Sequence, residues 1–575
     1  MMKLFRNLRP FALPIAIVLA LVFLQSLSEL YLPTLMSDIV DTGIVKGDTA
    51  YILRVGGFML LVALGGVVCS IVAAWLSARI GMGFGRDLRA KVFVHVEGFS
   101  LHEFDRIGTP SLITRTTNDI TQVQMFTMVM MRMMVMAPIM AIGGVIMAVQ
   151  KDAKLTWVLV VVIPVIAALI TFTATKALPL FKAIQAKIDR INLVLREGLT
   201  GVRVIRAFNR IDHEKKRFDE ANVDLTNTSI RVNKIMALMM PLMMLIMNLT
   251  TIAIVWFGAK RIDLGEMQVG SLMAFIQYAM QILFSLLMVS FLFIMLPRAS
   301  ASGARISEVL AMAADIKDPR EPRRAEQERG HIELRGVSFS YPGAEEPAIR
   351  DISFDARPGE VNAIIGGTGS GKSTLVNLIP RFYDVASGSI LVDGVDIREM
   401  SQEDLRSRIG FVPQKAVLFN DTIANNIRFG REDATDEEVA RAAETAQATE
   451  FILAMKDGFQ SLVAQGGTNV SGGQKQRLAI ARALVRNPEI YVFDDTFSAL
   501  DFKTDAKLRA ALRKETARST VIIVAQRINT VMDADRIIVL EEGRVVGMGT
   551  HKELVRTCEV YREIVSSQLS EEELA

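Results

Sequence analysis

The chain has 575 residues, 51% of them hydrophobic, and a formal net charge of +3. This length predicts several domains, the positive mean hydropathy (+0.32) is high for a soluble protein, and the nearly balanced charge gives no sign of a nucleic-acid partner. The two cysteines, Cys69 and Cys558, are expected to be unpaired thiols without a disulfide or metal role.

Long apolar runs are confined to residues 1–300 and indicate a transmembrane domain. Because about 20 apolar residues cross a bilayer as a helix, we predict six spans, at about 11–33, 54–78, 125–149, 155–178, 236–259 and 270–296. The first span is too long for a cleaved signal sequence, and further spans follow it. Methionines gather in these spans; we interpret them mainly as lipid-facing and core residues, with an adaptable ligand surface as the alternative.

Basic residues indicate the orientation of the spans. Lys and Arg are frequent before the first span and in the connections 79–124 and 179–233, whereas the connection 34–53 holds Asp38 and Asp41. Since cytoplasmic segments carry the excess of Lys and Arg, we expect both termini and both long connections in the cytoplasm. The protein is therefore predicted to be a multi-pass protein of the cell (inner, cytoplasmic) membrane.

The two long connections are rich in helix formers and are expected to continue the spans into the cytoplasm. At ~1.5 Å per residue, helices of about 20–25 residues would reach roughly 30 Å. Bends are predicted near 102–111 and 197–209, where Gly and Pro interrupt the pattern. Inside the spans, Glu29 and Arg132 are candidate functional charges, although Glu29 is equally well explained by a place near the outer end of its span.

The second half of the chain has the composition of a soluble α/β domain, at 331–575, behind a charged linker at 313–330. A strand, a glycine-rich loop and a helix follow one another at 360–379, and the loop fits the pattern G-x-x-x-x-G-K-[ST]. Backbone N–H groups of such a loop bind phosphates. Lys372 is expected to reach the β- and γ-phosphates of a nucleotide, and the Ser373 hydroxyl to bind Mg²⁺.

Two further segments predict phosphate chemistry. The run "IYVFDD" (490–495) is interpreted as a second nucleotide strand, whose end places Asp494 to hold Mg²⁺ directly or through water. The segment "NVSGGQKQRLAIARAL" (469–484) opens a helix at Ser471, and an exposed helix N-terminus suits a phosphate. Because one nucleotide already has the glycine loop, this helix suggests a nucleotide that is held by another subunit.

These motifs, in this order, resemble those of the ATP-binding cassette (ABC) exporters over nearly the whole chain. The resemblance implies a multidomain membrane protein: a transmembrane domain at 1–312, with six helices and long cytoplasmic helical extensions, followed by an α/β P-loop nucleotide-binding domain. The two bends would correspond to coupling helices, and "SALD" (498–501) to the D-loop. ATP would be held between the Walker A loop of one subunit and the signature motif, here "VSGGQ" (470–474), of the other.

The resemblance also assigns roles to individual residues. It implies ATP binding by Tyr341, which would stack on adenine, by the Walker A residues Gly366, Gly367, Thr368, Gly369, Ser370, Gly371, Lys372, Ser373 and Thr374, and by the signature residues Ser471, Gly472, Gly473 and Gln474. The Mg²⁺ ligands would be Ser373, Asp494 and Gln414, the last of these in the Q-loop.

Two positions depart from the pattern of this family. Asp495 stands where a catalytic Glu is usual, and Gln526 stands where a switch histidine is usual. Asp495 is shorter by on the order of 1.5 Å, and a misplacement near 1 Å can cost about 100-fold in rate. Gln526 can donate a hydrogen bond but cannot carry a proton or a positive charge. With Gln414 as the third catalytic residue, we predict a site that binds ATP and hydrolyses it slowly.

The predicted function is ATP-driven export of amphiphilic drugs or lipid-like compounds through the lipid bilayer. A second, non-identical half-transporter would carry the usual Glu and His and do most of the hydrolysis. An ATP-gated channel or a regulatory membrane protein would use the same motifs, and a lipid flippase or a peptide exporter are further alternatives. An importer is disfavoured because spans and ATPase share one chain, and the lack of a peptidase domain before the first span argues against processing-coupled peptide export.

Overall fold

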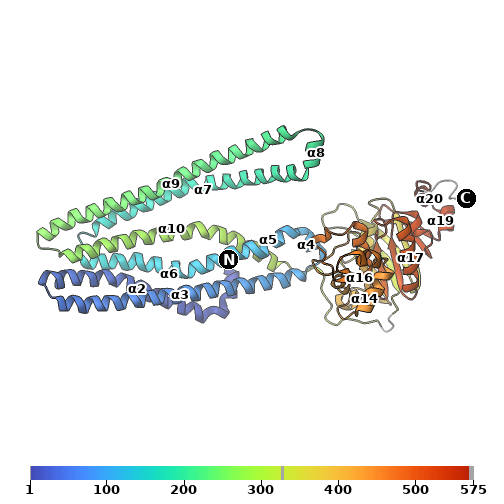
Figure 1. Cartoon of the computed structure of the whole chain (residues 1–575), viewed down its shortest axis with the longest axis horizontal. Helices are drawn as coiled ribbons and strands as arrows, with labels where there is room; N and C mark the ends of the chain where they lie inside the picture. The colour runs from blue at the N-terminus through green and yellow to red at the C-terminus, as the bar shows by residue number, and fades with distance from the viewer. Residues whose placement is uncertain (1, 326–328, 569–575) are drawn as a thin grey trace. The chain divides into compact units, whose positions relative to one another are not determined.

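Residues 2–325 and 329–568 are described by the computed structural model of the chain (Figure 1). Their contacts divide the chain into two compact units. The first unit consists of Met1–Glu97 and Pro110–Met312, and the second consists of Gly98–Thr109 and Ala313–Ala575. The second unit therefore includes a short segment from the first long connection between the spans.

Among the residues that the structure describes, six helices are long and apolar enough to cross a membrane, which confirms the number of predicted spans. They belong to the long helices α2 (Ala12–Asp38), α3 (Thr49–Glu97), α6 (Ile120–Lys151), α7 (Trp157–Thr200), α9 (Ile211–Asp263) and α10 (Val269–Ala311). The short helices of this half of the chain are α1 (Met2–Phe5), η1 (Arg6–Phe11), η2 (Ile39–Ile44), α4 (Leu101–Ile107), α5 (Thr109–Thr114), η3 (Arg115–Asp119) and α8 (Val202–Ala207).

The long helices pack in antiparallel pairs. Helix α2 packs against α3, α6 against α10, and α7 against α9 (Figure 1). Several of them continue well beyond their apolar stretch, as the helix-forming composition of the long connections predicts. Helix α8 lies at the turn between α7 and α9, and α4 ends at Gly108, whose φ is 80°.

Among its described residues, the second unit contains two sheets. The smaller one is antiparallel, with the order β2 (Ile349–Ala356), β1 (Ile332–Phe339), β4 (Ser387–Val392) and β5 (Val395–Asp396). The larger one has the order β10 (Arg544–Gly549), β9 (Arg536–Glu541), β3 (Val361–Gly366), β8 (Thr520–Val524), β7 (Ile490–Asp494) and β6 (Ile409–Val412). Every strand pair from β9 to β6 is parallel.

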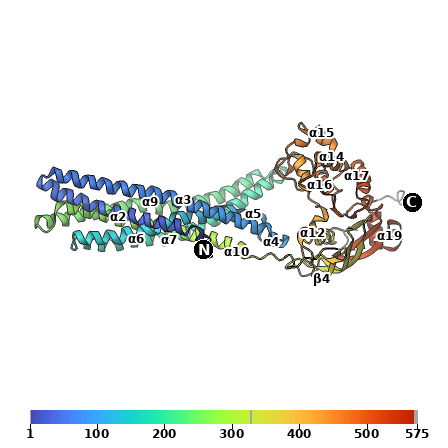
Figure 2. The ribbon, with the colours of Figure 1, turned by 90° about the horizontal axis from the view of Figure 1, so that it is seen from below.

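Helices surround these sheets (Figure 2). They are α11 (Lys372–Leu378), α12 (Gln402–Ser407), α13 (Ile423–Arg428), α14 (Asp436–Thr445), α15 (Thr449–Ala454), α16 (Gly472–Arg486), α17 (Phe502–Glu515), α18 (Ile528–Val531), α19 (His551–Thr557) and α20 (Glu559–Ser566), with the 3₁₀ turns η4 (Gly458–Gln460) and η5 (Gln465–Gly467). Strands β7 and β8 are buried along their whole length, as their unbroken apolar sequence predicts for a covered parallel sheet.

The parallel strands place the candidate site residues at one edge of the larger sheet. Strands β3, β8, β7 and β6 are consecutive neighbours, so their carboxyl ends meet at the same side of the sheet. The glycine loop follows β3, and Gln526 follows β8. Asp494 ends β7 with Asp495 directly after it, and Gln414 follows β6. Four segments that lie far apart in the sequence are thereby placed around one site.

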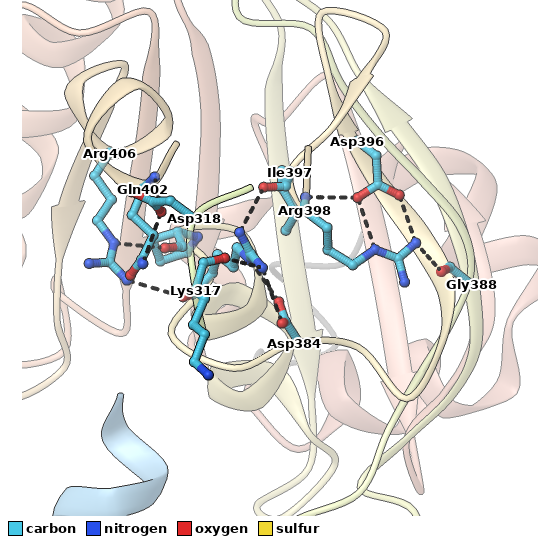
Figure 3. A network of polar contacts seen from close by, with 11 residues as sticks. Lys317, Asp318, Asp384, Gly388, Asp396, Ile397, Arg398, Gln402 and Arg406 are labelled. Atoms are coloured by element: carbon cyan, nitrogen blue, oxygen red, sulfur yellow. Dashed lines mark hydrogen bonds and ion pairs between the residues drawn. The ribbon is translucent and has the colours of Figure 1, made fainter. Parts of the chain in front are cut away.

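The linker is fixed to the second unit by polar contacts (Figure 3). The carbonyl of Lys317 accepts a hydrogen bond of 3.5 Å from buried Arg381, which also binds Asp384 at 2.7 Å. The Asp318 carboxylate accepts from the backbone and side-chain N–H groups of Gln402 at 3.0 and 3.1 Å. The start of the linker is thus bound to the rest of the second unit.

Helix α4 is also bound to this unit. Asp315 hydrogen bonds through its carboxylate with His102, and its backbone N–H donates to Glu103 at 3.1 Å. The Tyr383 hydroxyl donates to the Asp105 carboxylate at 3.1 Å. These contacts explain why residues 98–109 group with the second unit.

Candidate functional site

The glycine loop between β3 and α11 makes a turn that side chains would obstruct. Gly369 and Gly371 have φ of 84° and 94°, in the left-handed region that favours glycine. A Cβ on Gly366 would lie 2.1 Å from the carbonyl oxygen of Leu540, whereas a Cβ on Gly367 would meet no atom within 4 Å. The loop therefore packs closely against the protein at Gly366 and has open space beside Gly367. Such open space lets a phosphate approach the backbone closely.

Lys372 lies inside this loop. Its side chain is only 8% exposed, and its amine donates to the carbonyls of Gly366 and Gly367 at 2.8 and 2.6 Å. Burial lowers the pKa of Lys372, and the nearby carboxylates of Asp495 and Asp494 act in the opposite direction. The positive charge is thus held where the loop would surround a phosphate.

Ser373 and Asp494 form a pair of oxygen donors beside the loop. The Ser373 hydroxyl donates to Oδ1 of Asp494 at 2.9 Å, and Asp494 is 4% exposed at the end of β7. Burial raises the pKa of Asp494, while the Ser373 hydrogen bond acts against that rise. Hydroxyl and carboxylate oxygens are the ligands that Mg²⁺ prefers, so the chemistry of this pair fits a magnesium ion.

The three residues predicted to be catalytic meet at one oxygen atom. Oδ2 of Asp495 accepts a hydrogen bond of 3.2 Å from Nε2 of Gln414 and another of 3.0 Å from Nε2 of Gln526. The backbone of Asp495 is left-handed, with φ 45°, and its N–H donates to the carbonyl of Val524 at 3.0 Å. The backbone of Asp495 is therefore fixed to β8, and its carboxylate is held by two amides.

Asp495 is buried, and two amide groups donate hydrogen bonds to its carboxylate. Its side chain is 7% exposed; burial raises its pKa, and the hydrogen bond from Gln414 acts against that rise. A general base must bring an oxygen within hydrogen-bond reach of the proton that it removes. Here a short side chain has one of its two oxygens engaged by two neutral donors.

Three residues of this network were not assigned a role from the sequence. The Ser498 hydroxyl donates to the carbonyl of Asp495 at 2.9 Å, and Arg527 donates to the carbonyl of Ser498 at 3.0 Å. Gln476, two residues past the signature motif, donates to the carbonyl of Gln414 at 2.8 Å. The sequence placed Ser498 in the D-loop motif without predicting its hydrogen bond, and no sequence signal indicated Gln476.

Tyr341 lies beside the glycine loop. Its hydroxyl is 3.0 Å from that of Thr374, and its ring meets those of Phe339 and Tyr383 edge to face, with centroids 5.0 and 5.6 Å away. The side chain is 36% exposed. An anchored and partly exposed aromatic ring of this kind can stack on a flat base.

The signature residues form the N-terminus of α16. The Ser471 hydroxyl accepts from the N–H of Gln474 at 3.3 Å, and the Gln474 side chain accepts from the N–H of Ser471 at 2.8 Å, which makes a capping box. A Cβ on Gly472 would meet no atom within 4 Å, and one on Gly473 would lie 3.1 Å from the Ala499 carbonyl. Within the described residues, no hydrogen bond joins these four residues to the glycine loop.

Comparisons with known proteins agree with this arrangement. A family model described as the ABC transporter transmembrane region matches residues 15–286, and one described as ABC transporter matches residues 349–498. An uncharacterized ABC transporter ATP-binding protein of Mycobacterium tuberculosis is 47% identical over 567 residues, which cover 98% of this chain and 97% of that protein.

Two further similar proteins link the fold to membrane transport. An ATP-dependent lipid A-core flippase of Chromobacterium violaceum is 31% identical over 95% of this chain and 93% of its own length. A solved structure of a bacterial Atm1-family ABC exporter with ATP bound matches with a TM-score of 0.81 and 26% identity, over 98% of this chain and 99% of that one.

Proposed function

Because the chain belongs to the ABC transporter family, as an exporter of the half-transporter type, we propose that it exports amphiphilic drugs or lipid-like compounds as one subunit of a heterodimer. Its own Walker A site binds ATP and hydrolyses it slowly. Its signature residues Ser471–Gln474 complete the active site of a non-identical partner, which does most of the hydrolysis. The similarity to a lipid A-core flippase supports a lipid-like substrate.

The observation that carries this proposal is the position of the Asp495 carboxylate. Oδ2 of Asp495 accepts hydrogen bonds from both Gln414 and Gln526. Neither amide can take up or release a proton in the way that a histidine does. A base that is one methylene short, and that two neutral amides restrain, supports nucleotide binding with slow hydrolysis.

The remaining residues of the site suit Mg²⁺ and ATP. Lys372 neutralises phosphate charge and Tyr341 stacks on the adenine. Ser373, Asp494 and Gln414 would hold Mg²⁺, which would neutralise phosphate charge. The partner's signature helix would then approach the open side of the glycine loop, where Gly367 has no neighbour within 4 Å of a Cβ position.

Transport follows from closure of the two nucleotide-binding domains on ATP, which favours one membrane conformation over the other. In this proposal the chain is a transmembrane domain at 1–312, a linker at 313–330 and a nucleotide-binding domain at 331–575. The segments that include α4 and α8 act as coupling helices, and the N-terminus and the nucleotide-binding domain lie in the cytoplasm.

ATPase measurements test the proposal directly. The chain is purified alone and together with a half-transporter encoded beside it, and both preparations are assayed in lipid nanodiscs. We expect slow hydrolysis by the chain alone and fast hydrolysis by the complex. Asp495→Ala in the complex is expected to leave most of the turnover intact. Fast hydrolysis by the chain alone, or loss of turnover in that variant, would contradict the proposal.

A further inference from the structure

The carboxylate of Glu29 lies within the apolar part of α2. Helix α2 begins at Ala12 and ends at Asp38. At a rise of 1.5 Å per residue, Glu29 is about 26 Å along the helix from Ala12 and about 14 Å from Asp38. The predicted span ends at about residue 33, so this carboxylate lies inside the span, about one helical turn from its outer end. Ionisable groups at such depth usually serve a ligand or an ion.

Two glutamines hold Glu29 from two different helices. Nε2 of Gln25, one turn earlier in α2, donates to the Glu29 carboxylate at 2.9 Å. Nε2 of Gln281, in α10, donates to the Glu29 carbonyl at 3.0 Å. Both amide nitrogens face an acceptor, so both amide orientations are fixed, because a flipped amide would point its oxygen at another oxygen.

The amide oxygens are left without a partner. Oε1 of Gln25 and Oε1 of Gln281 are buried, and neither accepts a hydrogen bond. Gln25 is 6% exposed. Buried polar atoms in proteins nearly always have a hydrogen-bond partner, so each of these two acceptors calls for an explanation.

The group has acceptors but lacks a positive charge. Among the residues that the structure describes, no Lys, Arg or His forms an ion pair with Glu29. A carboxylate and two carbonyl oxygens are together complementary to a cation that also carries N–H donors. An ammonium group meets both requirements, since it offers a charge and up to three donors.

The surroundings favour an ammonium that is attached to an apolar body. Leu30, next to Glu29, belongs to a buried cluster that includes Met140, Tyr278 and Ile282. The Tyr278 hydroxyl donates to the Leu30 carbonyl at 3.0 Å, which ties α10 to this turn of α2. An alkyl or aromatic body would find apolar side chains within one or two helical turns of the carboxylate.

We propose that Glu29, Gln25 and Gln281 recognise the ammonium group of a cationic amphiphile within the membrane. This inference rests on the proposed export function and narrows its substrates to amphiphiles with a protonated primary or secondary amine. Glu29 supplies the charge, and the two amide oxygens accept N–H groups of the ligand. Neutral and anionic amphiphiles lack the group that these acceptors fit.

A binding experiment without ATP separates this site from hydrolysis. The complex of this chain with its partner is reconstituted in nanodiscs and titrated with two dansyl probes, one carrying a dodecyl chain that ends in a primary ammonium and the other its N-acetylated, neutral form. Binding is followed by fluorescence anisotropy. Each variant is compared with the wild type for the same probe, so that unequal partitioning of the two probes into lipid cancels.

We expect Glu29→Gln to weaken binding of the ammonium probe by about 10- to 100-fold, the range for loss of a charge-assisted hydrogen bond. Binding of the neutral probe should change less than about twofold, since no charge-assisted hydrogen bond is lost. Gln25→Leu and Gln281→Leu remove acceptors without removing charge, and each should weaken only the ammonium probe, by roughly 3- to 10-fold. Asp263→Asn, an exposed carboxylate at the end of α9, is the control and should affect neither probe.

Several outcomes would overturn the inference. Unchanged ammonium binding in Glu29→Gln would show that the carboxylate is not used, and an equal loss for both probes would show a purely structural role. If Glu29→Gln prevents assembly while both leucine variants bind the two probes as the wild type does, the inference also fails. If the wild-type complex binds neither probe, the result contradicts the proposed export of amphiphiles as well as the ammonium site.

Discussion

Restoring the length and chemistry of the family's usual base should increase hydrolysis at the site of this chain. The perturbation is the double variant Asp495→Glu with Gln526→His. It lengthens the side chain that follows the Walker B aspartate, and it replaces one of the two amides on Oδ2 by an imidazole. All other residues of the site, including Lys372 and Ser373, stay in place.

The magnitude follows from the hydrogen bonds of the carboxylate. Its Oδ2 lies 3.2 Å from the Gln414 amide and 3.0 Å from the Gln526 amide, so it cannot advance without breaking both bonds. One added methylene moves the carboxylate forward by on the order of 1.5 Å, and a misplacement near 1 Å costs about 100-fold in rate. We therefore expect a rate increase of about 10- to 100-fold, or about 1.4–2.7 kcal/mol in the activation free energy.

The assay must report this site alone. The complex is prepared with a partner whose catalytic Glu is replaced by Gln, and phosphate release is measured at saturating Mg-ATP. Asp533→Glu with Gln460→His is the matched control, because both residues are exposed and neither contacts the network around Asp495. An increase below about threefold in the double variant, or an equal increase in the control, would refute the account of Asp495 as a shortened base.

Three further predictions follow from the site and its surroundings. Ser471→Ala should lower the ATPase rate of the complex at least about tenfold, because in the proposed heterodimer the signature of this chain completes the partner's site. The same variant should leave ATP binding by the chain's own glycine loop unchanged in a nucleotide-binding assay. Gly371→Ala should destabilise the nucleotide-binding unit by about 1–3 kcal/mol and lower its thermal unfolding midpoint, because φ is 94° and a Cβ would lie 2.8 Å from the Ala348 carbonyl; Gly367→Ala should leave that midpoint unchanged. Tyr383→Phe removes the hydrogen bond to Asp105 and should reduce transport per ATP hydrolysed by up to about fivefold, measured as probe uptake into inverted vesicles beside phosphate release.

The membrane helices could be predicted from the sequence because hydropathy acts locally. A run of about 20 apolar residues has few alternatives to a spanning helix, and the described part of the chain contains six such helices. The strand, loop and helix around Lys372 were equally predictable, since the glycine pattern and the flanking apolar run lie within one short segment. The helical extensions followed from composition for the same reason.

The network around Asp495 could not be predicted from the sequence, because it depends on strand order. Gln414 and Gln526 are separated from Asp495 by 81 and 31 residues along the chain. They meet because β6, β7 and β8 are neighbours in the sheet. The sequence indicated each of these residues as a candidate for the site, but it did not indicate that both amides would donate to the same carboxylate oxygen. The group around Glu29 could not be predicted either, because Gln281 is 252 residues from Glu29 along the chain and lies on another helix.

The most direct test of the central claim is to follow the fate of the nucleotide on this subunit. The complex is incubated with azido-ATP that carries distinguishable labels at the α- and γ-phosphates, crosslinked by light after increasing times, and separated into its two subunits. The account predicts that this chain keeps a γ-to-α label ratio near that of intact ATP while the partner's ratio falls with turnover. A ratio that falls on this chain at the same rate as on its partner would contradict it.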